Sequence, residues 1–274
     1  MFLSWFIIGL FFLYRFIQYP TKRSSLILSV VIALTANTRI IGFILLFAAC
    51  VYLVYAILTK KICGKEFLIN GLILVGINLF LWFLFLPASW GKPISFLIST
   101  LKHFSNYDLV GKELYMGKLE LSTNLPWHYL PIWIFISTPI FYITLFFMGI
   151  AFLIKRFFAK NTKQIFDYFI LGILFISLLL PIYLHSTLYN GWRHFYFLYV
   201  PILYLAVFGL SILLAIKNTI LKFVILEISV VSLIYNGAWM IRSHPYQMVY
   251  FNGFVRDKAP YNFEKDYWGI SSSE

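Results

Sequence analysis

The sequence predicts an all-α polytopic membrane protein with about eight transmembrane helices, a long external loop and a short external tail. Of its 274 residues, 61% are hydrophobic and only 12% are charged, whereas soluble domains are about 45–50% apolar and about 25% charged. A soluble fold could not bury that much apolar surface behind so few charged side chains. The same composition excludes disordered and disulfide-rich classes.

Eight apolar stretches are candidates to cross a membrane, because each is almost free of charged residues. They are residues 2–19, 26–38, 40–58, 67–86, 132–154, 165–184, 195–216 and 223–240. The second stretch is short for a crossing, so the second and third could instead form one bent hairpin that meets near Arg39. This division predicts a transmembrane domain over residues 1–240, with an external loop at 87–131, and an external tail at 241–274.

The distribution of lysine and arginine predicts which loops face the cytoplasm. Twelve of the 22 basic residues lie in alternate connections or at the end of the first span: Arg15, Lys22, Arg23, Lys60, Lys61, Lys65, Lys155, Arg156, Lys160, Lys163, Lys217 and Lys222. The short connections on the other side contain only Arg39 and Arg193. By the positive-inside rule the first set is cytoplasmic, so the long loop and the tail are external. The net charge of +12 therefore indicates membrane topology rather than nucleic-acid binding.

This orientation places most reactive side chains on the external face. All five histidines lie there: His103, His128, His185, His194 and His244. Seven of the ten acidic residues also lie there, so we expect any chemistry at the external face. Cys63 would lie in the reducing cytoplasm and Cys50 within a span, so no disulfide is expected.

The two isolated external arginines are candidates to bind a lipid phosphate. Arg39 lies where two apolar stretches meet, and Arg193 lies in the short turn HSTLYNGWRH at residues 185–194. A guanidinium group matches a phosphate with two parallel hydrogen bonds. The alternative is that both side chains only reach out of the membrane to the interface.

Aromatic and polar residues beside these arginines predict a surface that binds a sugar or an isoprenoid chain. Trp127, His128 and Tyr129 are bracketed by two prolines, which suggests a fixed surface; an interfacial aromatic belt is the alternative. The remaining candidates come from the short turn and the tail: Tyr189, Asn190, Trp192, His194, His244 and Tyr246. A divalent metal is possible, but a histidine pair without a nearby carboxylate is a weak metal signal, so no cofactor is assigned.

Three external strings carry a resemblance to a known family. They are LYMGKLELSTNLPWHYLPIWIFISTP, LYNGWRHFYFLYVP and HPYQMVYFNGFV followed by DYWG. In this order they resemble the later half of bacterial membrane glycosyltransferases of the GT-C superfamily, in particular the protein O-mannosyltransferase-like enzymes. The resemblance implies a GT-C-like fold in the bacterial inner membrane. It also implies transfer of a sugar from a polyprenyl-phosphate donor to a lipid, glycan or protein acceptor at the external face.

The chain departs from this family at its start. In the superfamily an acidic catalytic residue lies in the first external loop, whereas here the first span runs directly into the cytoplasmic Thr21, Lys22 and Arg23. We therefore expect a family member without its front portion, which binds polyprenyl phosphate but transfers sugar poorly alone. No catalytic base is assigned, and Asp266 in the DYWG string is the remaining acidic candidate.

Two other functions stay open at this point. The chain could be a catalytically silent accessory membrane subunit, or a transporter of a small molecule or lipid. Transporters carry charged residues within their spans and often have internal repeats. These spans are almost free of charges, and the two halves of the chain do not repeat.

Overall fold

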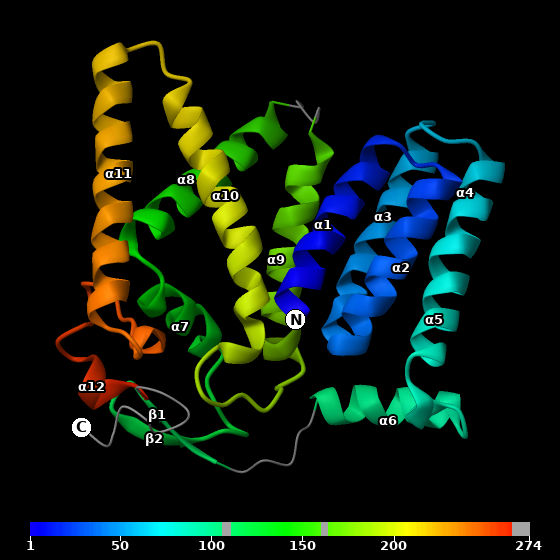
Figure 1. The fold of residues 1–274 in the computed structure, drawn as a ribbon, viewed down its shortest axis with the longest axis horizontal. Helices are drawn as coiled ribbons and strands as arrows, with labels where there is room; N and C mark the ends of the chain where they lie inside the picture. The colour runs from blue at the N-terminus through cyan, green and yellow to red at the C-terminus, as the bar shows by residue number, and fades with distance from the viewer. Residues whose placement is uncertain (106–110, 160–163, 265–274) are drawn as a thin grey trace. The chain divides into compact units, whose positions relative to one another are not determined.

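The structure, a computed structural model, is mostly helical (Figure 1). It describes residues 1–105, 111–159 and 164–264. Within these residues, six helical segments are long and apolar enough to cross a membrane: Ile40–Leu58, Gly64–Leu84, Ile140–Phe158, Ile165–Tyr183, Arg193–Leu214 and Thr219–Arg242. These segments agree with the predicted all-α membrane protein, while the count of eight spans stays a prediction.

The first two predicted spans form helices of 17 residues each, α1 (Phe2–Gln18) and α2 (Lys22–Thr38). Helix α2 begins four residues before the predicted apolar stretch because Thr21 and Ser24 form a capping box. The Ser24 N–H donates to the Thr21 hydroxyl at 3.2 Å, and the Thr21 N–H donates to the Ser24 hydroxyl at 3.0 Å. Both helices are shorter than the roughly 20 residues that usually span a bilayer.

The chain forms two compact units, of which the first comprises Met1–Phe104 and Gln164–Ser177. Besides α1 and α2 it contains η1 (Ile40–Gly42), α3 (Phe43–Leu58), α4 (Gly64–Leu72), η2 (Ile73–Ile77), α5 (Asn78–Leu84), η3 (Pro87–Ser89), α6 (Pro93–Ser105) and the first part of α9 (Ile165–Tyr183). Fully buried side chains from α1, α2 and α3, such as Phe16, Leu28 and Leu45, form its core. The second and third predicted stretches form α2 and α3, which are joined at Arg39 and η1 and pack against each other.

Buried polar side chains join α2 to the continuous helix formed by α4, η2 and α5. The Ser25 hydroxyl donates to Asn70 Oδ1 at 3.0 Å, and Asn78 Nδ2 donates to the Ser29 carbonyl at 3.1 Å. Such bonds between membrane helices contribute about 0.6–2 kcal/mol each. These bonds fix the position of α2 along the length of the neighbouring helix. Apolar contacts alone specify that position only weakly.

The second unit comprises Ser105–Lys163 and Leu178–Glu274. It contains β1 (Lys112–Tyr115), β2 (Lys118–Leu121), α7 (Tyr129–Ser137), α8 (Ile140–Phe158), the end of α9, η4 (Arg193–Leu198), α10 (Tyr199–Leu214), α11 (Thr219–Arg242), η5 (Gln247–Val249) and α12 (Ala259–Asn262). The strands form an antiparallel hairpin. The predicted external loop at 87–131 therefore contains regular structure, namely η3, α6, this hairpin and the start of α7.

The predicted span at 132–154 is wrong in its bounds, because the chain breaks between α7 and α8. Thr138 is extended (φ −106°, ψ 137°), as the residue before a proline tends to be, and Pro139 has no N–H to continue the helix. The Asn252 side-chain amide donates to the carbonyls of Phe135 and Thr138 at 2.7 and 3.1 Å. The tail thus satisfies carbonyl groups that the end of α7 leaves without helical partners.

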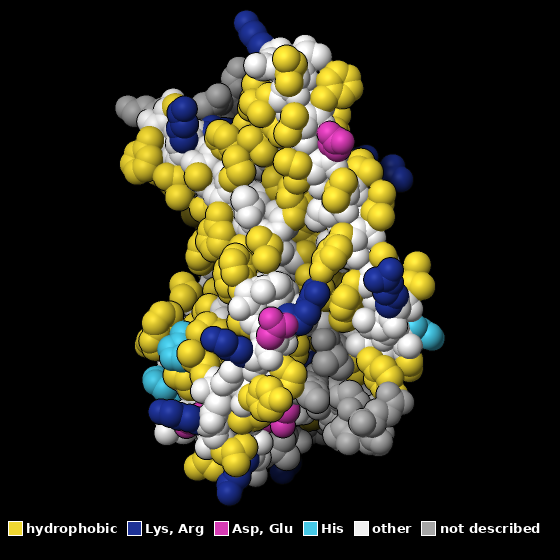
Figure 2. Space-filling view, turned by 90° about the vertical axis from the view of Figure 1, so that its left-hand side faces the viewer, with side chains coloured by type: hydrophobic (Ala, Val, Ile, Leu, Met, Phe, Trp, Pro, Cys, Tyr) yellow, Lys and Arg dark blue, Asp and Glu magenta, His cyan; other side chains and the backbone are white. Residues whose placement is uncertain are grey.

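Helix α11 exposes apolar side chains on most of its surface. Figure 2 shows a broad band of hydrophobic side chains over this part of the second unit. Ile220, Phe223 and Ile234 are each about two-thirds or more exposed, and Ser229 is the one residue of α11 that is buried. A helix that is apolar all round but lies outside the protein core suits contact with lipid.

Two glycines allow α8 and α10 to cross closely. A Cβ atom on Gly149 would collide with the backbone carbonyl of Leu205, and one on Gly209 would collide with the carbonyl of Leu145. Small residues at membrane helix crossings let two backbones approach and gain dispersion contacts. The α8–α10 crossing therefore depends on glycine at both positions.

We predict that Gly149→Ala lowers the free energy of unfolding by about 1–3 kcal/mol, because the added methyl group forces α8 away from α10. Gly237→Ala on α11 is the matched control, since a Cβ atom there meets nothing within 4 Å. Thermal unfolding of the purified variants in detergent measures both effects. Equal stability of the two variants would contradict the close crossing.

Candidate functional site

The β1–β2 hairpin carries an acidic side chain into the interior of the second unit. Side chains alternate between the two faces of a strand, so Glu113 and Tyr115 share the buried face. Only 5% of Glu113 is exposed. The hairpin turns at Met116 and Gly117, whose φ angles of 52° and 79° suit the tight turn between twisted strands.

A second turn presents hydrogen-bond donors to Glu113. Asn190 and Gly191 have φ angles of 53° and 67°, so their backbone N–H groups can serve one site. The Asn190 N–H donates to Glu113 Oε2 at 2.8 Å, and the Gly191 N–H donates to the Tyr129 hydroxyl at 3.0 Å. The Tyr129 hydroxyl donates in turn to Glu113 Oε2 at 3.4 Å. Two donors therefore meet at one carboxyl oxygen.

The tail brings a second carboxyl group to the same place. Short helix α12 ends just before Phe263, which forms a bridge with Tyr115 of β1, and the Glu264 N–H donates to the Leu114 carbonyl at 3.2 Å. The Glu264 carboxyl group lies within reach of a hydrogen bond with the Glu113 carboxyl group. Two carboxyl groups can form a hydrogen bond only when one of them holds a proton.

The surroundings favour a proton on Glu113. Burial and the neighbouring Glu264 carboxyl raise the pKa of Glu113 to about 8, although the Asn190 N–H and the Tyr129 hydroxyl act in the opposite direction. Glu264 Oε2 is buried and has no donor within the described part of the chain. A proton on Glu113 gives the Glu264 carboxylate the donor that it otherwise lacks. Burial also raises the pKa of Tyr129, so its hydroxyl stays protonated and remains a donor.

A cavity of about 60 Å³ lies beside this pair and is lined by Glu264, Asn190 and Gly191. Its aromatic walls are Trp133, Trp192, Tyr196, Tyr250 and Phe251. A single water needs only about 10–15 Å³ of such space, so the cavity admits a small polar group of a ligand. The site therefore combines a proton-holding carboxyl pair with an aromatic wall.

Three of the residues predicted from sequence meet at this site: Tyr129, Asn190 and Trp192. The Trp192 indole N–H donates to the Ser137 hydroxyl at 2.8 Å, which orients the ring in the cavity wall. His128 does not line the cavity, but its Nδ1 shares a 2.6 Å hydrogen bond with the hydroxyl of Tyr115, which lies on the same face of β1 as Glu113. Trp127 is 70% exposed and lies outside the cavity wall.

Three further predicted residues form a separate cluster within the Tyr189–His194 turn. The Arg193 guanidinium lies 4.8 Å from the centre of the Tyr189 ring. Arg193 Nε donates to His194 Nε2 at 3.1 Å, and the Tyr189 and His194 rings lie edge to face with centroids 4.9 Å apart. The arginine is thus held in a defined orientation, three residues after Asn190, whose N–H binds Glu113.

The remaining predicted residues lie away from the cavity wall or outside the described residues. Arg39 ends α2 in the first unit, with its guanidinium 5.8 Å from the centre of the Phe2 ring. His244 Nδ1 shares a 2.8 Å hydrogen bond with Gln247 Nε2, and neither His244 nor Tyr246 lines the cavity. Asp266 lies outside the described residues. Binding of a lipid phosphate by Arg39 and Arg193 stays a prediction.

No metal centre is evident in the part of the chain that the structure describes, where no three side chains of histidine, cysteine, aspartate or glutamate converge. Comparisons of the chain with protein-family models, with curated proteins and with solved structures found no match. The resemblance to GT-C glycosyltransferases therefore rests on the three external strings.

Sequence reasoning missed Glu113 and Glu264 as a pair. The segment KELYMGKLEL has the alternation and the Met-Gly turn of a hairpin. That pattern could have put Glu113 and Tyr115 on one face. Glu264 has no such local signal, since its position depends on how the tail folds back onto β1.

We predict that stability falls as the pH rises from about 4.5 to about 8. Unfolded Glu113 loses its proton near pH 4.5, whereas the folded protein keeps it until about pH 8, so the folded state binds more protons within this window. The stabilisation is complete below the lower pKa and is lost through the upper one, by at most about 1.4 kcal/mol per pH unit.

Glu113→Gln should flatten this dependence, because glutamine does not titrate and can still donate to Glu264. Thermal unfolding of the wild type and the variant in detergent, from about pH 5 to about pH 9, compares the two slopes. Identical slopes would show that Glu113 is not the titrating group.

Proposed function

We propose that the protein is a membrane glycosyltransferase that uses the Glu113–Glu264 pair in acid–base catalysis at the external face. The observation that supports this is the buried Glu113 carboxyl group next to Glu264 and an aromatic cavity, with the pKa of Glu113 raised to about 8. Such perturbed carboxyl groups in a pocket are typical of functional sites. The sugar and the polyprenyl-phosphate donor come from the resemblance of the external strings.

Glu264 is the proposed catalytic base. It lines the cavity, whereas Glu113 lies behind it on β1. Because Glu113 keeps its proton to about pH 8, Glu264 is the carboxyl group of the pair that is left to take a proton from an acceptor hydroxyl. Glu113 is then a positioning residue that orients Glu264 and keeps the pair at a single negative charge.

The proposed reaction is a displacement at the anomeric carbon of the donor sugar. The acceptor hydroxyl gives its proton to Glu264, and its oxygen bonds to the anomeric carbon. The bond from that carbon to the phosphate oxygen breaks, and polyprenyl phosphate leaves with the electron pair. A positioned base contributes about 10²–10⁴-fold to the rate of such a step.

Arg193 is the proposed partner of the leaving phosphate. Its guanidinium is held by Tyr189 and His194, three residues from the Asn190 N–H that binds Glu113. A fixed cation at the leaving oxygen stabilises the charge that develops there.

We predict that Glu264→Gln lowers sugar transfer by about 10²–10⁴-fold, because the amide cannot accept the acceptor's proton. The assay uses proteoliposomes with the full chain, bacterial membrane lipids and a panel of radiolabelled polyprenyl-phosphate sugars. Glu120→Gln is the matched control, since Glu120 is the cross-strand neighbour of Glu113 and lies outside the cavity wall.

The pH profile separates catalysis from a purely structural role. Wild-type transfer should fall above about pH 8, where Glu113 ionises beside Glu264, and Glu113→Gln should abolish that fall. Full activity of Glu264→Gln would exclude Glu264 as the base. No transfer from any donor by the wild type would favour an accessory subunit or a transporter instead.

A further inference from the structure

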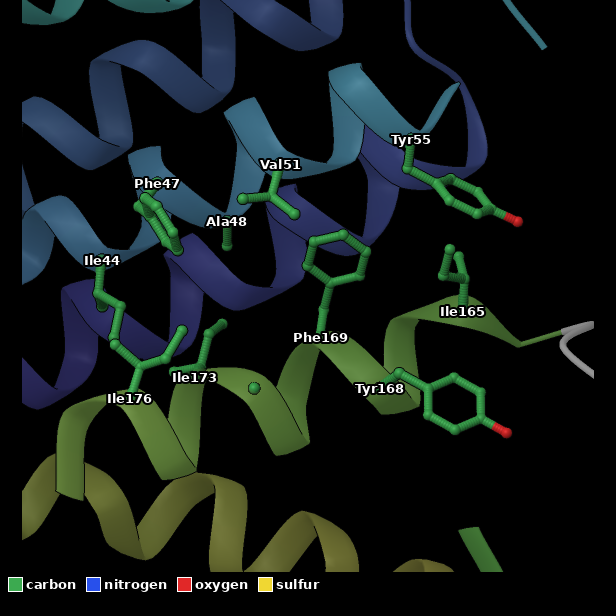
Figure 3. Close-up of a pocket in the computed structure, with 11 residues that line it drawn as sticks. Ile44, Phe47, Ala48, Val51, Tyr55, Ile165, Tyr168, Phe169, Ile173 and Ile176 are labelled. Carbon is green, nitrogen blue, oxygen red and sulfur yellow. The ribbon is translucent and has the colours of Figure 1, made fainter. Parts of the chain in front are cut away.

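An apolar groove runs between α3 and the first part of α9 within the first unit (Figure 3). Its volume is about 280 Å³, close to the lower end, about 300 Å³, of pockets that hold small ligands. Ala48 and Ile173 are buried at its floor, whereas Phe47 and Val51 at its rim are 54% and 42% exposed. The groove is therefore open along one side.

The groove lies on segments that are long and apolar enough to cross a membrane. Both Ile40–Leu58 and Ile165–Tyr183 belong to this set, and no charged residue lines the groove. In a bilayer such a groove is filled by hydrocarbon rather than by water, because contact between water and its apolar walls is unfavourable. A lipid acyl chain is the occupant that this composition fits.

One end of the groove has a different character. Tyr55 and Tyr168 lie at the same end, and Figure 3 shows both hydroxyl groups directed away from the apolar part. Helix α3 ends here, and the exposed Lys60 and Lys61 follow at once. Lys61 Nζ lies 5.2 Å from the centre of the Tyr55 ring. Tyrosine and lysine at the end of a span are typical of the level of lipid headgroups.

The charges at this end favour an anionic headgroup. Lys60 and Lys61 belong to the connections that the basic residues assign to the cytoplasm, whose leaflet carries anionic lipids. Asp167 is the acidic residue nearest in sequence to Tyr168, but it is buried and does not line the groove. The end of the groove therefore lies beside the positively charged side chains of Lys60 and Lys61.

We propose that this groove binds one acyl chain of an anionic phospholipid of the cytoplasmic leaflet, with Lys61 beside the phosphate. This site lies on the first unit and is independent of the carboxyl pair and of the proposed transferase function. The apolar walls take the acyl chain, and Lys61 with Tyr55 at one end of the groove takes the headgroup.

Gly172 offers a direct way to fill the groove. It lines the groove, and a Cβ atom there meets nothing within 4 Å, so Gly172→Leu places a side chain into the groove without displacing the protein. Gly237→Leu on α11 is the matched control, because it has equal space and lies elsewhere. Lys61→Gln tests the headgroup, with Lys65→Gln in α4 as its control.

The experiment is native mass spectrometry of the full chain titrated with phosphatidylglycerol or phosphatidylcholine. The wild type should retain phosphatidylglycerol at roughly five-fold lower lipid concentration, and Lys61→Gln should lose this preference. Gly172→Leu should lose retention of both lipids, while both control variants behave as the wild type. Equal retention of the two lipids by the wild type, or wild-type retention by Gly172→Leu, would overturn the proposal.

Discussion

The close approach of the Glu113 and Glu264 carboxyl groups is the constraint around which the hairpin, the Asn190 turn and the tail of the second unit meet. Glu113 comes from the hairpin, and Glu264 from the tail that folds back onto it. Two ionised carboxylates this close would repel each other where the surroundings screen poorly. A proton on Glu113 removes that repulsion, so the hairpin, the Asn190 turn and the tail can meet at one point.

The raised pKa of Glu113 connects stability to the proposed chemistry. A carboxyl group that keeps its proton in the neutral range can exchange it there, which is what an acid–base catalyst requires. The donors around Glu113 are a backbone N–H and a tyrosine hydroxyl that burial keeps protonated, so their geometry does not change with pH near neutrality. The site therefore holds one titrating pair within fixed surroundings, next to a cavity with aromatic walls.

Most of the helical architecture could be predicted from the sequence, because long apolar stretches without charged residues adopt few structures other than a membrane-spanning helix. The helix bounds within residues 132–154 were harder to predict, since α7 ends and α8 begins around Pro139 inside one apolar stretch. Tyr129, Asn190 and Trp192 were predicted as site residues from local patterns around prolines and glycines. The partnership of Glu113 with Glu264 was not, because it joins segments 151 residues apart through a backbone bridge that no local pattern encodes.

Infrared spectroscopy of the detergent-purified protein tests the shared proton most directly. A protonated carboxyl group has a carbonyl stretch distinct from that of a carboxylate, so the difference between the wild type and Glu113→Gln isolates this group. The account predicts a protonated-carboxyl band at neutral pH that is present in the wild type, absent from the variant, and lost as the pH rises through about 8. Identical protonated-carboxyl bands in the wild type and in Glu113→Gln at neutral pH would contradict it.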